Sequence, residues 1–407
     1  MRTITKRNNI SLQAVGYQSE LPGVEYVEHE YITRVGDAVY NALTGEAIVI
    51  DDEGADKAEM IRRWILAPRG MNLAGLAHMT RQTAHNMKTS RWVNRYTIFT
   101  TTGCNGSCEY CFQRGIEPLT MSTETAADVA NWILKHANPG LMINIRWFGG
   151  EPLVNKAVIS QICQALKDNR RRYQSSMSSN GDLFEGVTDE EVELWQLKSV
   201  QFTIDAPGEE YDRIKGLPAG AYDRLKATVE RFPGINFGIR VHYDPVKGTE
   251  PCWEIIDDFK CYSNVVMYAA MLYDGAKTQA DYEELLKIED HMIEAGKMVP
   301  RLPGWTPDVN CMADNRQQAC ITPTGDLTPC EHVVTGESYG TIYSDTRDQT
   351  VLDKWAAKCK DDEDGCGECP LYPACEKLCR CESAGKCSEG YKYYLLERIK
   401  RALIEVV

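Results

Sequence analysis

The sequence predicts an α/β protein whose centre is a parallel sheet with helices outside it. Between Arg95 and about Met298, six segments rich in β-branched and aromatic residues alternate with six segments of helical period. This alternation favours a parallel sheet, because each helix carries the chain back to the edge where the next strand begins. A strand-rich stretch precedes this part of the chain and a cysteine-rich stretch follows it. We therefore expect three regions, residues 1–93, 94–300 and 301–407.

The N-terminal region, residues 1–93, is predicted to be a small α+β domain. Short strands are expected at 31–35 and 39–50, with turns at Gly36 and Gly45. A helix is expected at 57–66, where a following proline ends it. The region carries no chemical motif, so a structural cap and a binding site for a peptide leader both remain open interpretations.

The central region supplies the strands of the predicted parallel sheet. The predicted strands cover 95–102, 141–148, 174–179, 199–205, 235–243 and 264–273. The predicted helices lie near 122–137, 154–172, 188–196, 220–231, 251–260 and 281–298. Active sites of such sheets lie at the carboxyl ends of the strands, where the strand-to-helix turns converge. We therefore expect the functional side chains in those turns.

The composition disfavours several classes of partner. A net charge of −14 disfavours a nucleic-acid partner, because phosphate binding needs concentrated Lys and Arg. No uncharged apolar run approaches the roughly 18 residues of a membrane span, and the first residues lack the apolar core of a signal peptide. We therefore expect a cytoplasmic protein without a membrane partner. Sixteen cysteines in such a chain favour metal binding over a disulfide framework, since a reducing compartment keeps thiols free.

Three cysteines lie on one short loop after the first central strand, at Cys104, Cys108 and Cys111. The C-x3-C-x2-C spacing allows three thiolates to hold three corners of a cubane iron–sulfur cluster, which leaves the fourth iron without a protein ligand. Three chance cysteines and part of a zinc site are the alternatives, but zinc favours four protein ligands and no histidine lies near this loop in the sequence. The spacing therefore predicts an iron–sulfur cluster with one open iron.

Two motifs together resemble a known enzyme family. The cysteine loop has Tyr110 before its last cysteine, and Trp147-Phe148-Gly149-Gly150-Glu151-Pro152 follows the second strand. The pair resembles the radical S-adenosylmethionine (radical SAM) enzymes. The resemblance implies a partial (β/α)6 TIM-like barrel and a [4Fe–4S] cluster whose open iron is chelated by the amino and carboxylate groups of SAM. It also implies that the reduced cluster cleaves SAM to release a 5′-deoxyadenosyl radical.

The resemblance also implies which residues bind SAM. The amides of Gly149 and Gly150 are expected to hydrogen-bond the amino-acid part of SAM, because they end the second strand. The remaining positions implied to bind the cofactor are Tyr110, Glu151, Ser179, Asp205 and Arg240. A forked guanidinium suits a carboxylate, so Arg240 and Asp205 are alternatively expected to pair with each other.

The C-terminal region, residues 301–407, carries a second cysteine pattern. Cys366, Cys369, Cys375 and Cys379 follow the spacing C-x2-C-x5-C-x3-C, and a hairpin with Gly325 at its turn is predicted upstream. This arrangement resembles the SPASM extension of radical SAM enzymes, which implies two auxiliary [4Fe–4S] clusters and three clusters in all. A zinc ribbon is the alternative, since C-x2-C pairs also suit tetrahedral zinc.

The resemblance implies a ligand set for each auxiliary cluster. The nearer cluster would use Cys311, Cys330 and Cys379, with Cys320 as a candidate fourth ligand. The farther cluster would use Cys366, Cys369, Cys375 and Cys387, with Cys381 in reserve for the last position. Cys320 lies inside the predicted hairpin rather than before it. The nearer cluster is therefore expected to keep an open iron if Cys320 does not bind it.

The resemblance implies an enzyme that modifies a ribosomally synthesised peptide by forming a thioether, carbon–carbon or carbon–oxygen crosslink. Its partners would be the precursor peptide and a low-potential electron donor of the flavodoxin or ferredoxin type. An anaerobic sulfatase-maturating enzyme, which makes formylglycine, is the first alternative. Members of that group carry an Asp directly after the hairpin cysteine, where this chain has Glu331, our candidate catalytic base. An iron–sulfur electron-transfer or peptide-binding protein is an alternative of another class, although a SAM motif has no use in an electron carrier.

Overall fold

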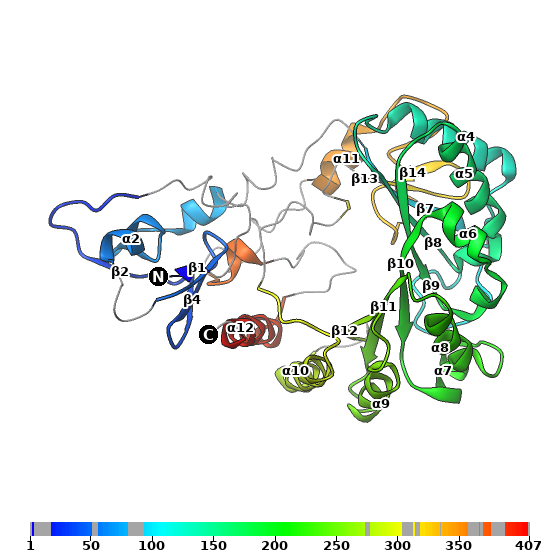
Figure 1. Ribbon diagram of the computed structural model, residues 1–407. Helices are drawn as coiled ribbons and strands as arrows, with labels where there is room; N and C mark the ends of the chain where they lie inside the picture. Colours follow the sequence, from blue (N-terminus) through cyan, green and yellow to red (C-terminus); the bar gives the residue numbers. More distant parts are fainter. Residues whose placement is uncertain are drawn as a thin grey trace.

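A central nine-stranded sheet organises the computed structural model (Figure 1). The structure describes residues 2–3, 18–50, 56–79, 93–272, 277–302, 312–313, 318–333, 335–356, 366, 369–375 and 387–405. The strand order is β12-β11-β10-β9-β8-β7-β13-β14-β15, and the strands from β12 to β13 run parallel. The fold is therefore α/β with a mostly parallel sheet, as the sequence predicts.

The six predicted central strands are all present and lie side by side in chain order. They are β7 (Arg95–Thr101), β8 (Ile143–Gly149), β9 (Tyr173–Ser179), β10 (Leu197–Ile204), β11 (Asn236–Tyr243) and β12 (Val265–Met271). Each strand adds beside the one before it, because a helix crosses over between them. The carboxyl ends of all six strands therefore lie along one edge of the sheet, which is where the predicted site residues come together.

Helices cover one face of this sheet (Figure 1). The predicted helices appear as α4 (Thr123–His136), α5 (Lys156–Asp168), α6 (Asp189–Trp195), α8 (Ala221–Arg231), α9 (Glu250–Phe259) and α10 (Gln279–Glu294). The sequence did not predict α7 (Gly208–Lys215), a short and strongly polar helix that follows β10. Two short 3-10 helices, η1 (Pro152–Asn155) and η2 (Asp182–Gly186), begin directly after the turns that follow β8 and β9.

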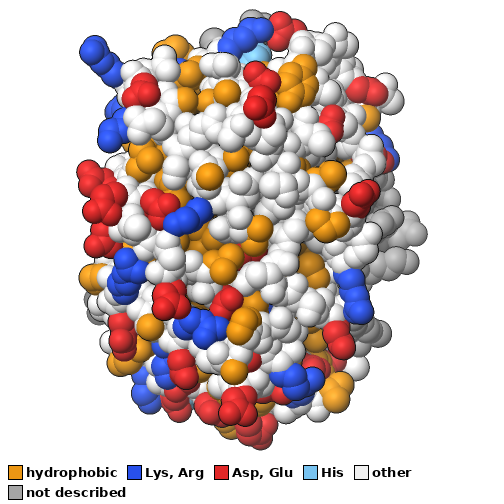
Figure 2. Space-filling view, turned by 90° about the vertical axis from the view of Figure 1, so that its right-hand side faces the viewer, with side chains coloured by type: hydrophobic (Ala, Val, Ile, Leu, Met, Phe, Trp, Pro, Cys, Tyr) orange, Lys and Arg blue, Asp and Glu red, His pale blue; other side chains and the backbone are white. Residues whose placement is uncertain are grey.

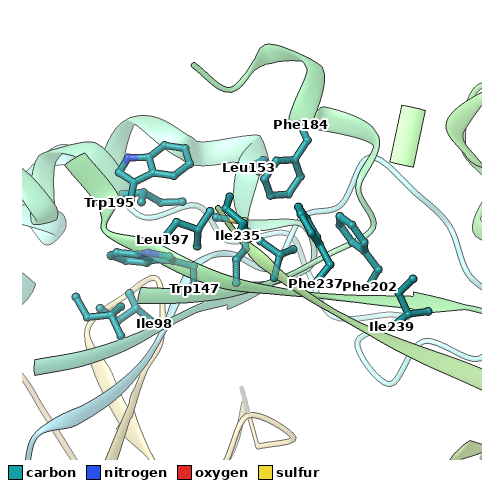
Figure 3. Close-up of a cluster of buried hydrophobic side chains, with 14 of the residues drawn as sticks. Ile98, Trp147, Leu153, Phe184, Trp195, Leu197, Phe202, Ile235, Phe237 and Ile239 are labelled. Carbon is teal, nitrogen blue, oxygen red and sulfur yellow. The ribbon is translucent and has the colours of Figure 1, made fainter. Parts of the chain in front are cut away.

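The two faces of the sheet have opposite chemistry, because successive strand residues point to opposite faces. Toward the helices, large apolar side chains such as Trp147, Phe202 and Phe237 are fully buried with Trp195 (Figure 3). The other face carries polar side chains, among them Arg146, Gln201, Thr203, Arg240 and His242, which line a cavity. The apolar face therefore stabilises the sheet, and the polar face is left for binding.

A hairpin extends the central sheet beyond β7. The predicted hairpin is confirmed as β13 (Gln318–Ile321) and β14 (Asp326–Thr328), and Gly325 in its turn has a φ of +87°. Strand β13 pairs in parallel with β7, in the register Cys320 to Thr97, and β15 (Gly340–Thr341) follows β14. The helix α11 (Gln349–Ala356) comes next along the chain. The residues after the hairpin consequently lie beside the cysteine loop that follows β7.

The N-terminal region forms a separate small sheet. The strand order is β1-β5-β4-β3, from β1 (Arg2–Thr3), β5 (Glu46–Val49), β4 (Ala38–Asn41) and β3 (Ile32–Val35), and β2 (Tyr26–Glu28) pairs with β6 (Leu66–Pro68). The predicted strand 39–50 is divided at its turn into β4 and β5. The predicted helix 57–66 is shorter and ends as α2 (Lys57–Arg62), because Trp64 has a φ of +60° and the following residues pair as β6.

The C-terminal helix α12 (Glu389–Ile404) lies between the N-terminal sheet and α10, as Figure 1 shows in red. Tyr394 donates a hydrogen bond to Glu289 of α10 at 2.6 Å, and Arg401 pairs with Asp290 at 2.7 Å. Its Ile399 packs in the cluster that contains Tyr31 and Tyr40 of the N-terminal region. The C-terminal helix therefore packs on the central part of the chain and also holds the N-terminal sheet.

The helix-covered side of the molecule shows no single dominant surface character (Figure 2). Acidic and basic side chains are interspersed with apolar ones over the described residues on this side. In the part of the chain that the structure describes, no helix combines the length and the apolar character needed to cross a membrane.

Two glycines at the end of β8 allow the chain to pass directly over the end of β7. Gly149 has a φ of +145°, and a Cβ there would lie 2.1 Å from the backbone oxygen of Thr101. A Cβ on Gly150 would lie 2.2 Å from the backbone oxygen of Gly103. Neither position therefore has room for a side chain unless the backbone before the first cysteine moves.

We predict that Gly150→Ala destabilises the protein, because the added methyl group meets backbone rather than a flexible side chain. The expected loss of unfolding free energy is roughly 1–3 kcal/mol, as for other overpacked sites. Urea unfolding followed by circular dichroism measures it. Gly234→Ala is the matched control, since a Cβ there would meet nothing within 4 Å. Equal stability of the two variants would contradict the close approach.

Candidate active site

The three cysteines predicted to hold a cluster lie on a loop that α7 holds in place. Cys104, Cys108 and Cys111 follow β7 and all line the same cavity. Within the loop, Ser107 donates its backbone N–H to the backbone oxygen of Lys215 at 2.7 Å. Lys215 ends α7, so this helix, which the sequence did not predict, fixes the middle of the cysteine loop.

The cavity at the carboxyl ends of the strands has a volume of about 460 Å³. It brings together nine of the predicted site residues, namely Cys104, Cys108, Tyr110, Cys111, Gly149, Gly150, Ser179, Arg240 and Glu331. Glu151 and Asp205 are buried behind its wall instead. The cavity thus joins the cysteine loop, the strand ends and the hairpin in one space.

The donor set of the loop fits a cluster with an open corner. Three sulfurs come from one short loop, and burial raises the pKa of Cys104 to about 11 and also raises the pKa of Cys108. Thiolates here would therefore need a cationic centre such as iron to stabilise them. The backbone nitrogen of Gly106 lies 3.3 Å from the sulfur of Cys104, and its N–H would stabilise negative charge on that sulfur. Within the described residues, no three His, Cys, Asp or Glu side chains surround a site for a single metal ion.

The predicted hydrogen bonds from the glycine amides to SAM differ from the structure in one respect. The N–H of Gly150 donates to the backbone oxygen of Thr101 at 3.1 Å, so it is engaged within the protein. The backbone oxygen of Gly149 accepts from the side chain of Gln113 at 3.1 Å. Gly149 and Gly150 line the cavity, and the absence of their side chains lets the chain lie against the backbone of Thr101 and Gly103.

Glu151 supports the wall from behind rather than lining it. Its carboxylate accepts hydrogen bonds from the Ser179 hydroxyl at 3.0 Å, from the Asn180 N–H at 2.8 Å and from the Leu153 N–H at 3.1 Å. Burial raises the pKa of Glu151 to about 7 despite these hydrogen bonds. The side chain therefore ties the turn after β9 to the turn after β8. A direct contact between Glu151 and SAM stays a prediction.

Asp205 is the centre of a buried polar network. Its carboxylate accepts from the Tyr110 hydroxyl, from Lys215 and from Nδ1 of His242, each at 2.7 Å. Burial alone would raise the pKa of Asp205, but the hydrogen bond from His242 and the charge of Lys215 bring it well below its usual range. The alternative pairing of Asp205 with Arg240 is not found, since the ion pairs of Asp205 among the described residues are with Lys215 and His242. Nε of Arg240 is buried and has no hydrogen-bond partner among the described residues.

His242 presents an unprotonated nitrogen toward the cavity. Its Nδ1 must donate, because the Asp205 carboxylate can only accept. Burial lowers the pKa of His242 even though Asp205 favours the charged form, and this direction favours the neutral imidazole. The lone pair of a neutral ring with a protonated Nδ1 lies on Nε2. No described residue hydrogen-bonds to Nε2, and His242 lines the cavity.

The opposite wall combines cationic, acidic and aromatic side chains. The guanidinium of Arg146 lies 5.0 Å from the ring centre of Phe148 and 3.4 Å from the carboxylate of Glu331. The rings of Phe112 and His332 lie 4.3 Å apart. Glu331 and His332 reach this wall because the hairpin places them beside the cysteine loop. The predicted candidate base thus faces the same cavity as the predicted cluster.

The auxiliary cysteines are only partly described. Cys320 is fully buried on β13 against Phe99, and Cys330 is buried after β14. Cys366 and Cys369 lie in one turn, in which the Cys369 N–H donates to the backbone oxygen of Cys366 at 3.1 Å. Cys375 and Cys387 are also within the described residues. Cys311, Cys379 and Cys381 lie outside them. Both auxiliary ligand sets therefore stay predictions.

Sequence reasoning missed Arg146, Lys215, His242 and His332. Arg146 and His242 each lie two residues from a residue that was singled out, so strand alternation offered a signal for both. His332 directly follows Glu331, and its place in the cavity depends on the pairing of β13 with β7. Lys215 gave no signal, because its helix was not predicted.

The comparisons with known proteins agree with this site. Residues 98–254 match the family model described as Radical SAM superfamily. No curated protein sequence matches the chain. Among solved structures, anSMEcpe with bound AdoMet and Cp18Cys peptide is 16% identical with a TM-score of 0.55, and the match covers 77% of this chain and 98% of that chain.

A second solved structure extends the likeness. Streptococcus suis SuiB bound to S-adenosylmethionine is 13% identical with a TM-score of 0.55, over 92% of this chain and 99% of that chain. SuiB bound to the precursor peptide SuiA is 14% identical with a TM-score of 0.52, and the match covers 87% of this chain and 95% of that chain. At such identities the likeness concerns the fold. The family match itself identifies residues 98–254 as a radical SAM domain, which indicates an enzyme that uses S-adenosylmethionine and a [4Fe–4S] cluster.

Proposed function

We propose that the protein is a radical SAM enzyme with a C-terminal SPASM extension that forms a crosslink in a ribosomally synthesised peptide. The observation that carries the proposal is the single cavity shared by the cysteine loop, the strand ends and the hairpin. The solved structures with a similar fold support a peptide as substrate, since SuiB is bound to a precursor peptide and anSMEcpe to the Cp18Cys peptide.

The cysteine loop is proposed to hold the SAM-binding cluster through Cys104, Cys108 and Cys111. When bound, the cluster and SAM supply a 5′-deoxyadenosyl radical that removes a hydrogen atom from the substrate. Gly149 and Gly150 line the cavity beside the loop, and the buried Nε of Arg240 is a donor for a carboxylate.

The protein's own groups are proposed to bind the peptide and to accept a proton from it. Crosslinking removes two hydrogens, one as an atom and one as a proton, and an auxiliary iron–sulfur cluster would supply an acceptor for the remaining electron. His242 is suited to take the proton at Nε2, because Asp205 holds Nδ1 and stabilises the imidazolium. Glu331 is the second candidate base, and its pairing with Arg146 holds it at the wall.

The flanking regions complete the proposal. The C-terminal cysteines are proposed to hold the two auxiliary clusters, with a low-potential flavodoxin or ferredoxin as the electron donor. The division into residues 1–93, 94–300 and 301–407 stays a proposal, as does leader binding by the first region. That region contacts the remainder of the chain through α12, so a bound leader would lie beside the C-terminal part.

Formation of formylglycine, as in sulfatase-maturating enzymes, is the second candidate function. The observation that favours it is Glu331, which follows the hairpin cysteine and lines the cavity. Its side chain is longer than the Asp of that group, so its carboxylate would reach a different point. The two candidates differ in product, because formylglycine carries an aldehyde and a crosslink does not.

The first prediction from the proposed function concerns the metal content. Anaerobically purified protein should contain about twelve irons, and a Cys104/Cys108/Cys111→Ala variant about eight, as three cubanes require. Iron and acid-labile sulfide assays measure both. Cys261→Ala is the matched control, since Cys261 is exposed and belongs to neither proposed site. About four irons together with zinc would remove the SPASM part of the proposal, and absence of iron would remove all of it.

The second prediction concerns the titration of His242. Asp205→Asn should lower the pKa of His242 further, because the carboxylate that favours the charged ring is lost while burial remains. Nuclear magnetic resonance of labelled histidine follows the titration. Asp257→Asn is the control, since Asp257 lies 3.5 Å from a different histidine, His291. An unchanged pKa of His242 in Asp205→Asn would rule out the proposed pair.

The third prediction concerns the product. Candidate precursor peptides encoded next to this gene, incubated with SAM and a low-potential reductant, should yield 5′-deoxyadenosine and a peptide two hydrogens lighter. The product should not react with an aldehyde probe such as an aminooxy compound. Mass spectrometry distinguishes the outcomes: an aldehyde-bearing peptide would support formylglycine formation instead, and unchanged peptides would count against both.

A further inference from the structure

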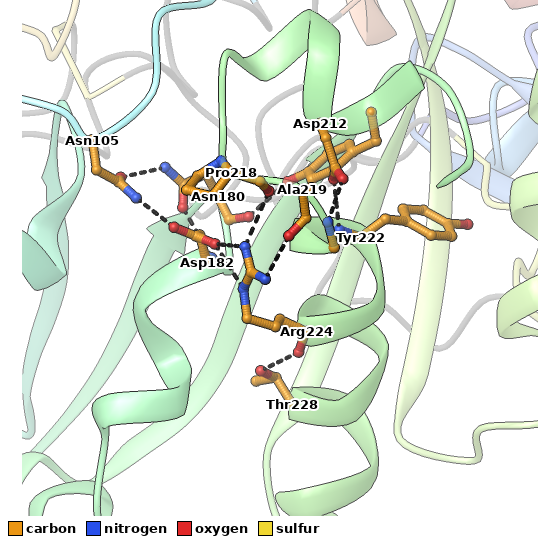
Figure 4. Close-up of polar contacts among 11 residues, drawn as sticks. Asn105, Asn180, Asp182, Asp212, Pro218, Ala219, Tyr222, Arg224 and Thr228 are labelled. Carbon is orange, nitrogen blue, oxygen red and sulfur yellow. Dashed lines mark hydrogen bonds and ion pairs between the residues drawn. The ribbon is translucent and has the colours of Figure 1, made fainter. Parts of the chain in front are cut away.

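The cysteine loop is held by an amide ladder that begins on the turn after β9 (Figure 4). The side chain of Asn105, directly after the first cysteine, lies between Asn180 and Asp182. Asn180 donates from Nδ2 to Oδ1 of Asn105 at 2.8 Å, and Asn105 donates from Nδ2 to the carboxylate of Asp182 at 2.8 Å. Gly181, between them in the chain, has a φ of +83°, which lets both neighbours face the loop.

The outer end of the ladder is anchored by an arginine of α8. Arg224 donates from Nε to the carboxylate of Asp182 at 2.9 Å and pairs with it through a second nitrogen. The same guanidinium donates to the backbone oxygens of Pro218 at 3.1 Å and Ala219 at 3.0 Å. Asp182 therefore acts as an acceptor whose position is set by a residue outside the site.

This anchoring determines how each amide is oriented. The carboxylate of Asp182 only accepts, so Asn105 must turn its nitrogen toward Asp182 and its oxygen toward Asn180. The oxygen of Asn180 accepts from the backbone N–H of Asp182 at 3.0 Å, so its nitrogen faces the cysteine loop. The backbone of Asn180 is held as well, by Glu151 at 2.8 Å and by the Tyr211 hydroxyl at 2.6 Å.

The nitrogen of Asn180 also approaches a proposed cluster ligand. Nδ2 of Asn180 lies 3.8 Å from the sulfur of Cys104, within reach of an N–H···S hydrogen bond. The backbone N–H of Gly106 is a second donor to the same sulfur, at 3.3 Å. Donors aimed at the sulfurs of an iron–sulfur cluster favour its reduced state, because reduction adds negative charge to the sulfurs.

We propose that Asn180 is a positioning residue that donates an N–H to the sulfur of Cys104 and thereby raises the reduction potential of the cluster on this loop. Asn105, Asp182 and Arg224 keep its amide in the required orientation. The inference rests on the proposed function, since it requires the cluster that Cys104, Cys108 and Cys111 are proposed to hold. It assigns the turn after β9 a role in electron uptake, before any substrate is bound.

The test measures the potential of the cluster without a substrate. Anaerobic redox titrations followed by electron paramagnetic resonance would use the signal that changes when SAM is added, which separates this cluster from auxiliary ones. Without SAM, Asn180→Ala should lower the equilibrium constant for one-electron reduction about tenfold, a shift of about 59 mV to more negative potential. Asn105→Ala should give a smaller shift in the same direction, because the donor remains but is no longer held.

Asn169→Ala is the matched control for loss of an asparagine amide. Its Nδ2 donates to the Ala165 backbone oxygen at 2.9 Å, and it ends α5 at the opposite edge of the sheet. The reduction potential of the cluster in Asn169→Ala should equal that in the parent protein. The Gly106 donor is unchanged in every variant, since it belongs to the backbone.

The outcomes separate the inference from the proposed function. A parent protein without a SAM-responsive cluster signal would remove the proposed function itself. Parent-like potentials in Asn180→Ala with full iron content would overturn the inference alone. If Asn180→Ala loses iron, the reduction potential of Asn105→Ala decides instead. A parent-like potential in Asn105→Ala would overturn the inference. Loss of iron from both variants would also overturn it, since the ladder would then serve assembly of the loop and not its potential.

Discussion

The buried carboxylate of Asp205 holds the elements of the site together. Asp205 directly follows β10 and binds Tyr110 of the cysteine loop, Lys215 of α7 and His242 of β11. Lys215 returns to the loop a second time through its backbone oxygen, which accepts from Ser107. Removing one partner from such a buried ion pair leaves a charge without compensation, which costs about 3–5 kcal/mol in other proteins. The position of the cysteines consequently depends on charges that lie outside the loop.

A second buried carboxylate, that of Glu151, holds elements together on the other side of the cysteine loop. Glu151 joins the turn after β8 to the turn after β9, and Asn180 of that turn reaches the sulfur of Cys104. Both carboxylates are behind the cavity wall, so they position residues without occupying space that a ligand needs. The cavity is therefore shaped by groups that do not line it.

The chemistry of the cavity follows from the two faces of the sheet. Apolar residues on one face pack under the helices, and the polar residues on the other face meet where the strands end. The hairpin β13–β14 closes this arrangement by pairing with β7, which brings Glu331 and His332 to the wall. The radical SAM domain thus receives side chains from a region that lies outside the family match of residues 98–254. We therefore propose that the peptide substrate binds in the whole cavity, and not only against residues of the radical SAM domain.

The sequence by itself determined the alternation of strands and helices, the hairpin turn and the three cysteines on one loop, because these depend on local periodicity, glycine conformation and spacing. It did not reveal α7, since eight residues with few apolar side chains are too short to establish a helical period, or the end of α2 at Trp64. Only the tertiary structure decided that Asp205 pairs with Lys215 and His242 and not with Arg240. It also decided that Glu151 lies behind the wall and that Gly150 uses its amide within the protein. Those outcomes depend on which residues meet across separate strand ends, and that information resides in the packing of the sheet.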